Sequence, residues 1–364
     1  MLILAINPGS TSTKLAIYDG DKKLWEKNIS YSINELSKYK EIIDQLEWRQ
    51  KLIKSKIKAA GFRVENMDAV VARGGAGLDP ITGGTYLIDE EMLKDLKIGK
   101  NAKHASNLAG IIAYNLVKDK DIPAFTVDPV SVDEFESIAR LSGFPEIIRR
   151  CQSHALNLKA VARNVAEKLD TEMNKINLIG VHLGGGISIA AMKKGRIIDV
   201  NNANQNGPYS PERSGTLPVL DLVEYIFSNN FDKNELKKKL IGKGGMVAYL
   251  GTNDGREIEK RISNGNKKAE LVYKGMIYQI AKEIGAMAAV LEGNIDGIFV
   301  TGGLAYSDYL INSIKKYVEW IAPIMVFPGA EEMKHLVKGV YRVLNNKEKA
   351  KVYKDERINL EDLL

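Results

Sequence analysis

The chain has 364 residues, which exceeds the size at which one hydrophobic core keeps growing, so we expect two domains. Hydrophobic residues make up 45% and charged residues 27% of it, as in ordinary globular proteins, and no apolar run approaches the roughly 20 residues of a membrane span. The net charge of +6 is scattered among acidic residues, which argues against a nucleic-acid-binding protein and suits an enzyme with anionic ligands. A single cysteine, Cys151, excludes an internal disulfide, and with no signal peptide we expect a cytoplasmic protein.

The beginning of the chain predicts three strands joined by two turns. The strands are expected at 2–6, 15–18 and 24–29, with a polar turn at 7–9 and a tight turn at 19–21. The same order recurs later, with strands at 178–183, 187–192 and 196–200, and turns at 184–186 and 194–195. Two copies of one pattern predict a duplicated domain.

Helical periodicity separates these copies and follows the second one. Helices are expected at 35–60, after His104, at 221–227, at 273–291, and from about Glu331 onward, with a short buried strand at 297–300. Strands that alternate with helices predict an α/β fold with mixed sheets.

Three predicted strand ends lead into turns of small residues. They are the segments NPGSTS at 7–12, HLGGG at 182–186 and TGGL at 301–304. Glycine turns let backbone N–H groups approach phosphate oxygens, while the hydroxyls at 10–13 and Lys14 would add donors and charge. The chain contains neither a G-x-x-x-x-G-K-[ST] nor a G-x-G-x-x-G motif, so a different kind of nucleotide cradle is predicted.

Three of the four histidines lie in polar or glycine-containing segments. His104, His154 and His182 lack the spacing of metal ligands, so they are either donors to anions or hydrogen-bonded buried residues. His335 lies in a plain helical segment, and we expect it at the surface.

Two arginines adjoin glycine or proline residues. Arg73 precedes Gly74-Gly75, and Arg213 lies within Ser-Pro-Glu-Arg-Ser-Gly. A loop of this kind presents a rigid guanidinium to a carboxylate or phosphate, although a surface arginine would look the same in sequence.

Three acidic residues stand where ligands often bind. Asp128 follows an apolar strand, and open α/β sheets bind ligands at such strand ends. Glu331 and Glu332 begin a helix, where they could serve magnesium or simply complement the helix dipole.

Taken together, these motifs resemble the acetate and butyrate kinase family, within the actin, sugar-kinase and Hsp70-like superfamily. The resemblance covers nearly the whole chain: NPGSTSTK, KHASNLAG, TVDP, SHALNLKAVA, HLGGG, SPERSGTLP and DGIFVTGGLAYS follow in the family order. It implies two duplicated ribonuclease H-like (actin-like ATPase) domains with an inter-domain cleft. The expected domains are residues 1–150, completed by a C-terminal helix at about 340–364, and a nucleotide-binding domain at 151–339.

The resemblance also implies site residues and ligands. The nucleotide ATP would be bound by Asn7, Ser10, Ser12, Lys14, His182, Gly184, Gly185, Gly186, Gly302 and Gly303. Catalytic positions would be Arg213, His154, Asp128 and Arg73, and Glu331 or Glu332 would serve Mg²⁺. The predicted reaction is reversible, in-line transfer from ATP to a short-chain fatty acid, giving an acyl phosphate and ADP.

Departures from the acetate kinase pattern bear on which fatty acid is the substrate. Val70 stands where acetate kinases carry arginine, so Arg73 would supply that charge from a shifted position. Ala72 and Ser153 replace larger side chains, and with His104 they would line the acyl site. The larger pocket favours butyrate over acetate. The alternatives are an acetate, propionate or branched-chain acid kinase, or a non-metabolic actin-like ATP-binding module. No nucleic acid or membrane partner is expected, whereas a homodimer or larger homo-oligomer is.

Overall fold

The computed structural model describes residues 1–359 and divides into two compact units. One unit comprises residues 1–133 and the chain from 331 onward, and the other comprises residues 134–330. The divisions therefore fall at 133/134 and 330/331, whereas the sequence placed them at 150/151 and near 340. The reason is that segment 134–150 is tied to the second sheet: Glu136 donates its N–H to Ile198 at 3.2 Å, and Arg149 forms an ion pair with Asp199 at 2.7 Å.

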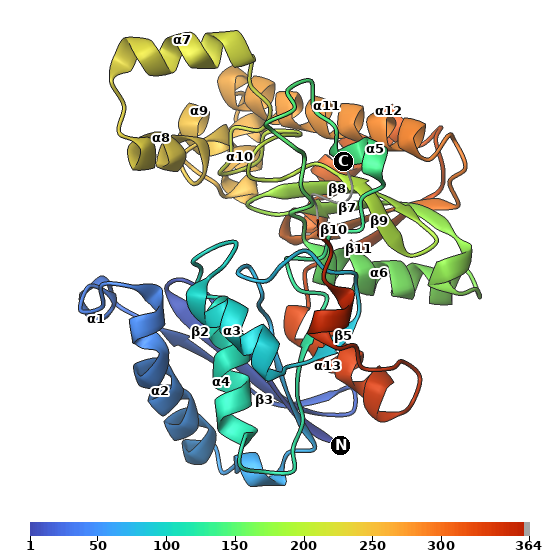
Figure 1. Ribbon diagram of the computed structural model, residues 1–364. Coiled ribbons are helices and arrows are strands. Elements are labelled where there is room, and N and C mark those ends of the chain that lie inside the picture. The colour runs from blue at the N-terminus through green and yellow to red at the C-terminus, as the bar shows by residue number, and fades with distance from the viewer. Residues whose placement is uncertain (360–364) are drawn as a thin grey trace. The chain divides into compact units, whose positions relative to one another are not determined.

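The first unit is built on a mixed six-stranded sheet with the order β3-β2-β1-β4-β6-β5, within residues 1–359 (Figure 1). Its strands are β1 (Leu2–Pro8), β2 (Ser12–Asp19), β3 (Lys22–Ser30), β4 (Ala69–Ala72), β5 (Thr85–Leu87) and β6 (Ala124–Val127). Strands β1, β2 and β3 are antiparallel neighbours, and β4 and β6 run parallel to β1.

The second unit repeats this topology in a five-stranded sheet with the order β11-β10-β7-β8-β9, counted over the same described residues. Its strands are β7 (Asn177–Leu183), β8 (Ile187–Lys193), β9 (Arg196–Val200), β10 (Gly297–Gly302) and β11 (Ile324–Pro328). Here too the first three strands are antiparallel, and the two later ones run parallel to the first. The predicted α/β class and the duplication are confirmed.

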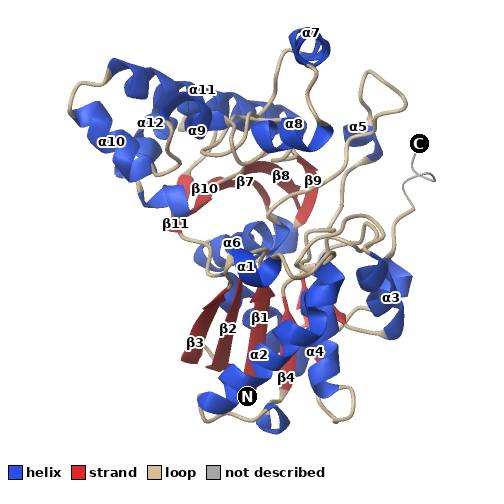
Figure 2. Ribbon diagram, turned by 90° about the vertical axis from the view of Figure 1, so that its left-hand side faces the viewer, coloured by secondary structure: helices blue, strands red, loops and turns tan. Residues whose placement is uncertain are grey.

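Helices flank both sheets (Figure 2). In the first unit these are α1 (Ile33–Leu36), α2 (Leu46–Ala59), α3 (Glu90–Ile98), α4 (Asn107–Val117) and α13 (Glu332–Leu344). In the second they are α5 (Ser137–Arg140), α6 (Ala155–Lys168), α7 (Val219–Asn229), α8 (Lys233–Leu240), α9 (Gly245–Leu250), α10 (Gly255–Ser263), α11 (Lys267–Val290) and α12 (Asp308–Val318). No helix within residues 1–359 has the length and apolar character needed to cross a bilayer.

Alternation along the strands explains the helical layers of the first unit. Leu4 and Ile6 face one side of the sheet and share a core with Leu108 of α4. Val127 faces α13, and it would lie 2.6 Å from a side chain added at Gly339. Helix α13 is therefore pressed closely against the sheet.

Three predictions about helices need correction. The helix predicted at 35–60 is interrupted, and α2 begins only at Leu46. The C-terminal helix predicted at about 340–364 ends at Leu344, since Asn346 adopts a left-handed conformation (φ 56°); residues 360–364 lie outside the described residues. His335 is buried rather than at the surface, because α13 packs against β1, β4 and β6.

Candidate active site

The glycine turn after β7 lies close to the ring of His182. His182 is the penultimate residue of β7, and Gly184, Gly185 and Gly186 form the turn to β8. A Cβ on Gly184 would lie 3.2 Å from Nε2 of His182. Glycine therefore allows the turn to pass close to that ring nitrogen.

Arg213 lies directly on this turn. A Cβ on Gly186 would come within 2.2 Å of Nη1 and 2.4 Å of Cζ of Arg213, so the guanidinium occupies the space that glycine leaves. The loop carrying Arg213 is fastened to the turn, because Oγ of Ser210 donates to the Gly185 carbonyl at 2.5 Å and accepts from the Arg213 N–H at 3.2 Å. Burial lowers the pKa of Arg213, and Glu212 acts in the opposite direction. The result is a poorly solvated cation beside a potential phosphate cradle.

The imidazoles of His154 and His182 stack with their centroids 3.9 Å apart and an interplanar angle of 14°. Nδ1 of His154 lies 2.9 Å from Oγ of Ser188, and Nδ1 of His182 lies 2.7 Å from Oδ1 of Asn157. At an effective dielectric constant of about 20, two charges at this separation would repel by about 4 kcal/mol. A positive charge on one ring therefore disfavours a second charge on the other.

The third glycine turn joins the same edge of the second sheet. Gly302 has φ of 95°, and a Cβ there would lie 2.2 Å from the Leu183 carbonyl oxygen. Gly302 and Gly329 exchange two backbone hydrogen bonds of 2.9 Å, and the Thr301 hydroxyl donates to the Gly329 carbonyl at 2.9 Å. An added Cβ on Gly303 would meet no atom of the described residues within 4 Å. The ends of β7, β10 and β11 are thus held together by backbone contacts, and space remains beside Gly303.

In the first unit, Asn7, Arg73 and Glu332 come together. Nδ2 of Asn7 donates to Oε2 of Glu332 at 2.7 Å, and Nη2 of Arg73 lies 3.0 Å from Oε1 of the same carboxylate. Glu331 instead approaches Lys334 at 3.7 Å, and its side chain is 65% exposed. Among residues 1–359 no group of three or more His, Cys, Asp or Glu side chains could hold a metal. The amide and carboxylate oxygens of Asn7 and Glu332 suit magnesium hydrated by water and bound to phosphate, rather than a closed protein site.

Asp128 follows β6, as expected, and is held in a strained conformation. It is 1% exposed and has φ of 38°, although it is not glycine. Its carboxylate accepts the Gly84 N–H at 2.8 Å, and its own N–H donates to the Gly84 carbonyl at 2.9 Å. Such strain persists where surrounding contacts enforce it, and it is concentrated at functional sites.

The orientation of His104 is determined by its own loop. Nδ1 of His104 lies 3.1 Å from the Ser106 N–H, which can donate to it, and 2.9 Å from the Ser106 hydroxyl, which can do the same; a ring that accepts in this way carries its proton on Nε2 when neutral. Desolvation, with a smaller effect of Arg73, lowers the pKa of His104. Gly74 permits the close approach of this loop, because a Cβ there would lie 2.3 Å from the Ser106 carbonyl oxygen. His104 is thus suited to donate to an anion while it stays neutral.

The turn between β1 and β2 is supported by a residue that sequence analysis missed. Arg49 of α2 is fully buried, and it donates to the carbonyls of Gly9 at 2.8 Å and Ser10 at 3.0 Å. Nothing in its helical sequence context distinguishes it from a surface arginine. Ser12 supplies its carbonyl to the Gly9 N–H at 2.8 Å, and Lys14 is exposed on β2.

The two small residues predicted to enlarge the acyl pocket are both buried. Ala72 ends β4 and is 0% exposed, and Ser153 is 6% exposed. Oγ of Ser153 lies 3.8 Å from Sγ of Cys151.

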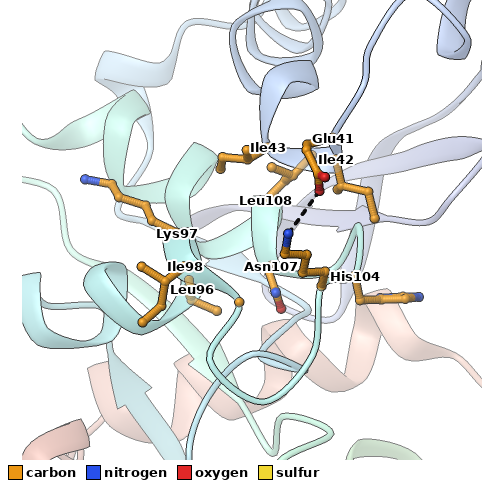
Figure 3. A pocket seen from close by; sticks show the side chains of 11 residues that line it. Glu41, Ile42, Ile43, Leu96, Lys97, Ile98, His104, Asn107 and Leu108 are labelled. Atoms are coloured by element: carbon orange, nitrogen blue, oxygen red, sulfur yellow. Dashed lines mark hydrogen bonds and ion pairs between the residues drawn. The ribbon is translucent and has the colours of Figure 1, made fainter.

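A cavity of about 140 Å³ lies behind the loop that carries His104. Its wall includes Ile42, Leu96 and Leu108, and the Lys103–Glu41 ion pair of 3.2 Å lies beside it. Figure 3 shows the ring of His104 turned away from the apolar side chains of this cavity. His104 nevertheless belongs to the lining of this cavity.

Comparison with known proteins agrees with this geometry. A model of the acetokinase family matches residues 143–315. The chain is 49% identical over 351 residues to "Probable butyrate kinase 2" of Caldanaerobacter subterraneus, which covers 96% of this chain and 99% of that protein. Its fold resembles acetate kinase from Porphyromonas gingivalis (TM-score 0.77, 20% identity, 93% of this chain and 99% of that chain) and a propionate kinase from Francisella tularensis (0.73, 19%, 92% and 98%). This chain belongs to the acetokinase family.

Proposed function

We propose that the chain transfers the γ-phosphoryl group of ATP to the carboxylate of a short-chain fatty acid, with butyrate as the preferred acid. The products are the acyl phosphate and ADP, and the reaction is reversible. Family membership supports a carboxylate phosphotransferase, and the 49% identical relative described as a probable butyrate kinase supports the choice of acid.

The observation that carries this proposal is the placement of Arg213 at Gly186 of the Gly184–Gly186 turn, whose Gly184 lies beside His182, the stacking partner of His154. A transferring phosphoryl group spreads negative charge over its equatorial oxygens, and enzymes stabilise it mainly with positioned donors and cations. A desolvated guanidinium over a glycine turn supplies such a cation at the place where phosphate would bind. A carboxylate is already a nucleophile at neutral pH, so no strong general base is needed.

The roles of the remaining residues follow from their contacts. Arg213 would orient the acid and offset developing charge, and His154 would donate to an equatorial oxygen. The backbone of Gly302 and Gly303 would receive the nucleoside. In the first unit Arg73 is paired with Glu332, so its role would be to hold that carboxylate rather than to bind the acid alone. Asp128, pinned by Gly84, would orient a neighbouring donor or a metal-bound water.

Glu332 and Asn7 would hold magnesium bound with ATP, which would supply positive charge against the phosphates. We propose Glu332 rather than Glu331 as the magnesium-associated acid, since Glu332 is held by Asn7 and Arg73 whereas Glu331 is largely exposed.

The test is a comparison of acids with the purified protein. Acyl phosphate is trapped with hydroxylamine, and ADP is measured in parallel, with acetate, propionate, butyrate and isobutyrate. We expect the highest kcat/KM with butyrate. A preference for acetate would overturn the choice of acid but leave the reaction class intact, and ADP without hydroxamate for every acid would overturn the kinase proposal in favour of an ATP-binding module.

We also propose that the protein forms a homodimer or a larger homo-oligomer in the cytoplasm. Helix α7 supports association, because all its residues are half-buried or exposed, and Leu220 and Phe227 are 83% and 81% exposed. Apolar exposure of this extent is typical of an interface. Light scattering on the wild type and on a Leu220→Glu, Phe227→Glu variant should show an assembly that dissociates; a monomeric wild type would contradict it.

A further inference from the structure

The contact between Asn157 of α6 and His182 of β7 determines which ring nitrogen of His182 carries a proton. We propose that the carboxamide of Asn157 donates to Nδ1 of His182 and so keeps the neutral ring protonated at Nε2, ready to donate to an anionic ligand. Asn157 is thereby a positioning residue that acts through His182. The inference deepens the proposed function, on which it rests for the identity of the ligand as a nucleotide phosphate.

The short distance and the burial show that this contact is a real constraint. Nδ1 of His182 and Oδ1 of Asn157 are 2.7 Å apart, and the two residues are 6% and 3% exposed. The oxygen and nitrogen of a carboxamide have nearly the same shape, so the orientation of the group must be decided from its hydrogen bonds. Two arrangements therefore fit one set of atom positions.

The two arrangements differ in what they leave unsatisfied. With the oxygen toward the ring, Nδ1 must be the donor, and the buried Nδ2 of Asn157 has no hydrogen-bond partner within residues 1–359. With the amide turned by 180°, the NH₂ group donates to Nδ1, and the unsatisfied atom is an oxygen. Buried N–H groups without a partner are rarer in proteins than under-satisfied oxygens. The second arrangement is therefore favoured, and it requires the proton of the neutral ring to sit on Nε2.

The surroundings of Nε2 suit a ring that carries its proton on this nitrogen. Nε2 faces the phosphate turn, 3.2 Å from the place of a Cβ on Gly184. A bare nitrogen lone pair there would repel an anion, whereas an N–H would bind it. His154 is stacked on this ring, and Arg213 and Glu212 lie over Gly186 and Gly185 of the adjoining turn. A neutral ring donates without adding a second cation beside His154 or Arg213.

His104 offers an independent example in the same chain. Its Nδ1 accepts the Ser106 N–H at 3.1 Å, which directs its proton to Nε2. A backbone N–H can only donate, and the Ser106 hydroxyl, 2.9 Å from the same nitrogen, can also donate to it. The same device would thus serve both histidines, with a side-chain donor at His182 and a main-chain donor at His104.

The decisive experiment reads the tautomer directly. Protein labelled with ¹⁵N-histidine is studied by NMR without ligand at pH 8, and the His182 signals are assigned by their loss in His182→Gln. We expect Nε2 to carry the proton, and a proton on Nδ1 would overturn the inference. This measurement needs no turnover, so it decides the matter even if the protein phosphorylates no acid and the proposed function fails.

A matched pair of variants tests the consequence for catalysis. In Asn157→Asp the carboxylate can only accept from Nδ1, so Nε2 loses its proton unless the ring becomes an imidazolium. We expect kcat/KM for ATP to fall about tenfold or more at pH 8.5 and to recover toward the wild-type value at pH 6. Asn157→Leu, of similar volume, should lower kcat/KM without this recovery. An Asn157→Asp variant with the wild-type pH profile would refute the role of Asn157. If this variant does not fold, the ¹⁵N-histidine NMR spectrum of the wild type still tests the tautomer.

Discussion

Replacing Gly186 by alanine puts a methyl group where the guanidinium of Arg213 now lies. The added Cβ would be 2.2 Å from Nη1, whereas ordinary van der Waals contact begins at 3.4 Å, so the guanidinium must move by about 1.2 Å. The displaced atoms are the end of a flexible side chain, and Gly186 needs no left-handed backbone conformation. We therefore expect the free energy of unfolding to change by no more than about 1 kcal/mol.

The effect on the reaction should be much larger than the effect on stability. A misplacement of about 1 Å in a positioning group costs roughly 100-fold in rate, which corresponds to about 2.7 kcal/mol of transition-state stabilisation. The kcat of Gly186→Ala, measured with butyrate and saturating ATP by hydroxamate formation, should fall by about this factor. The KM for butyrate should rise less than kcat falls, because Arg213 acts chiefly on the transferring group.

A second glycine provides the matched control. Gly285 lies inside α11, where a Cβ would meet no atom of the described residues within 4 Å. Gly285→Ala should leave kcat unchanged and stabilise the protein by up to about 1 kcal/mol, because alanine favours the helix. If Gly186→Ala turns over at the wild-type rate while retaining its melting temperature, the positioning of Arg213 is not what drives catalysis, and the assignment of this site is refuted.

Three further predictions address the site and its support. Arg213→Ala should lower kcat by about 1,000-fold or more with little change in melting temperature; near-normal turnover would exclude Arg213 from catalysis. Glu332→Gln should raise the Mg²⁺ concentration for half-maximal rate severalfold, whereas Glu331→Gln should not, and equal effects would contradict the choice between them. Burial raises the pKa of Tyr209, whose hydroxyl donates to the Val272 carbonyl at 2.5 Å, to about 12. The unfolded chain then loses this proton first as pH rises above about 10, so the free energy of unfolding measured by urea denaturation should fall there by up to about 2 kcal/mol, and less in Tyr209→Phe.

Much of the fold was predictable because its signals are local. Alternating apolar strands, the turn at Gly20 and the helix that carries Leu108 appear where the sequence indicates them, since these patterns depend on neighbours within a few residues. The helix ends were less predictable. Asn346 stops α13 early, and His335 is buried because α13 packs on a sheet whose strands come from distant parts of the sequence.

Contiguous motifs such as HLGGG and SPERSG identified the family, the repeated strand pattern and the residue types of the candidate site without coordinates. The folded structure was needed to show which side chains meet. It placed Arg213 on Gly186, joined Glu332 rather than Glu331 to Asn7 and Arg73, and revealed Arg49 beneath the turn between β1 and β2. These pairs are distant in sequence, and their contacts depend on strand register, loop closure and burial, which no local pattern of residues encodes.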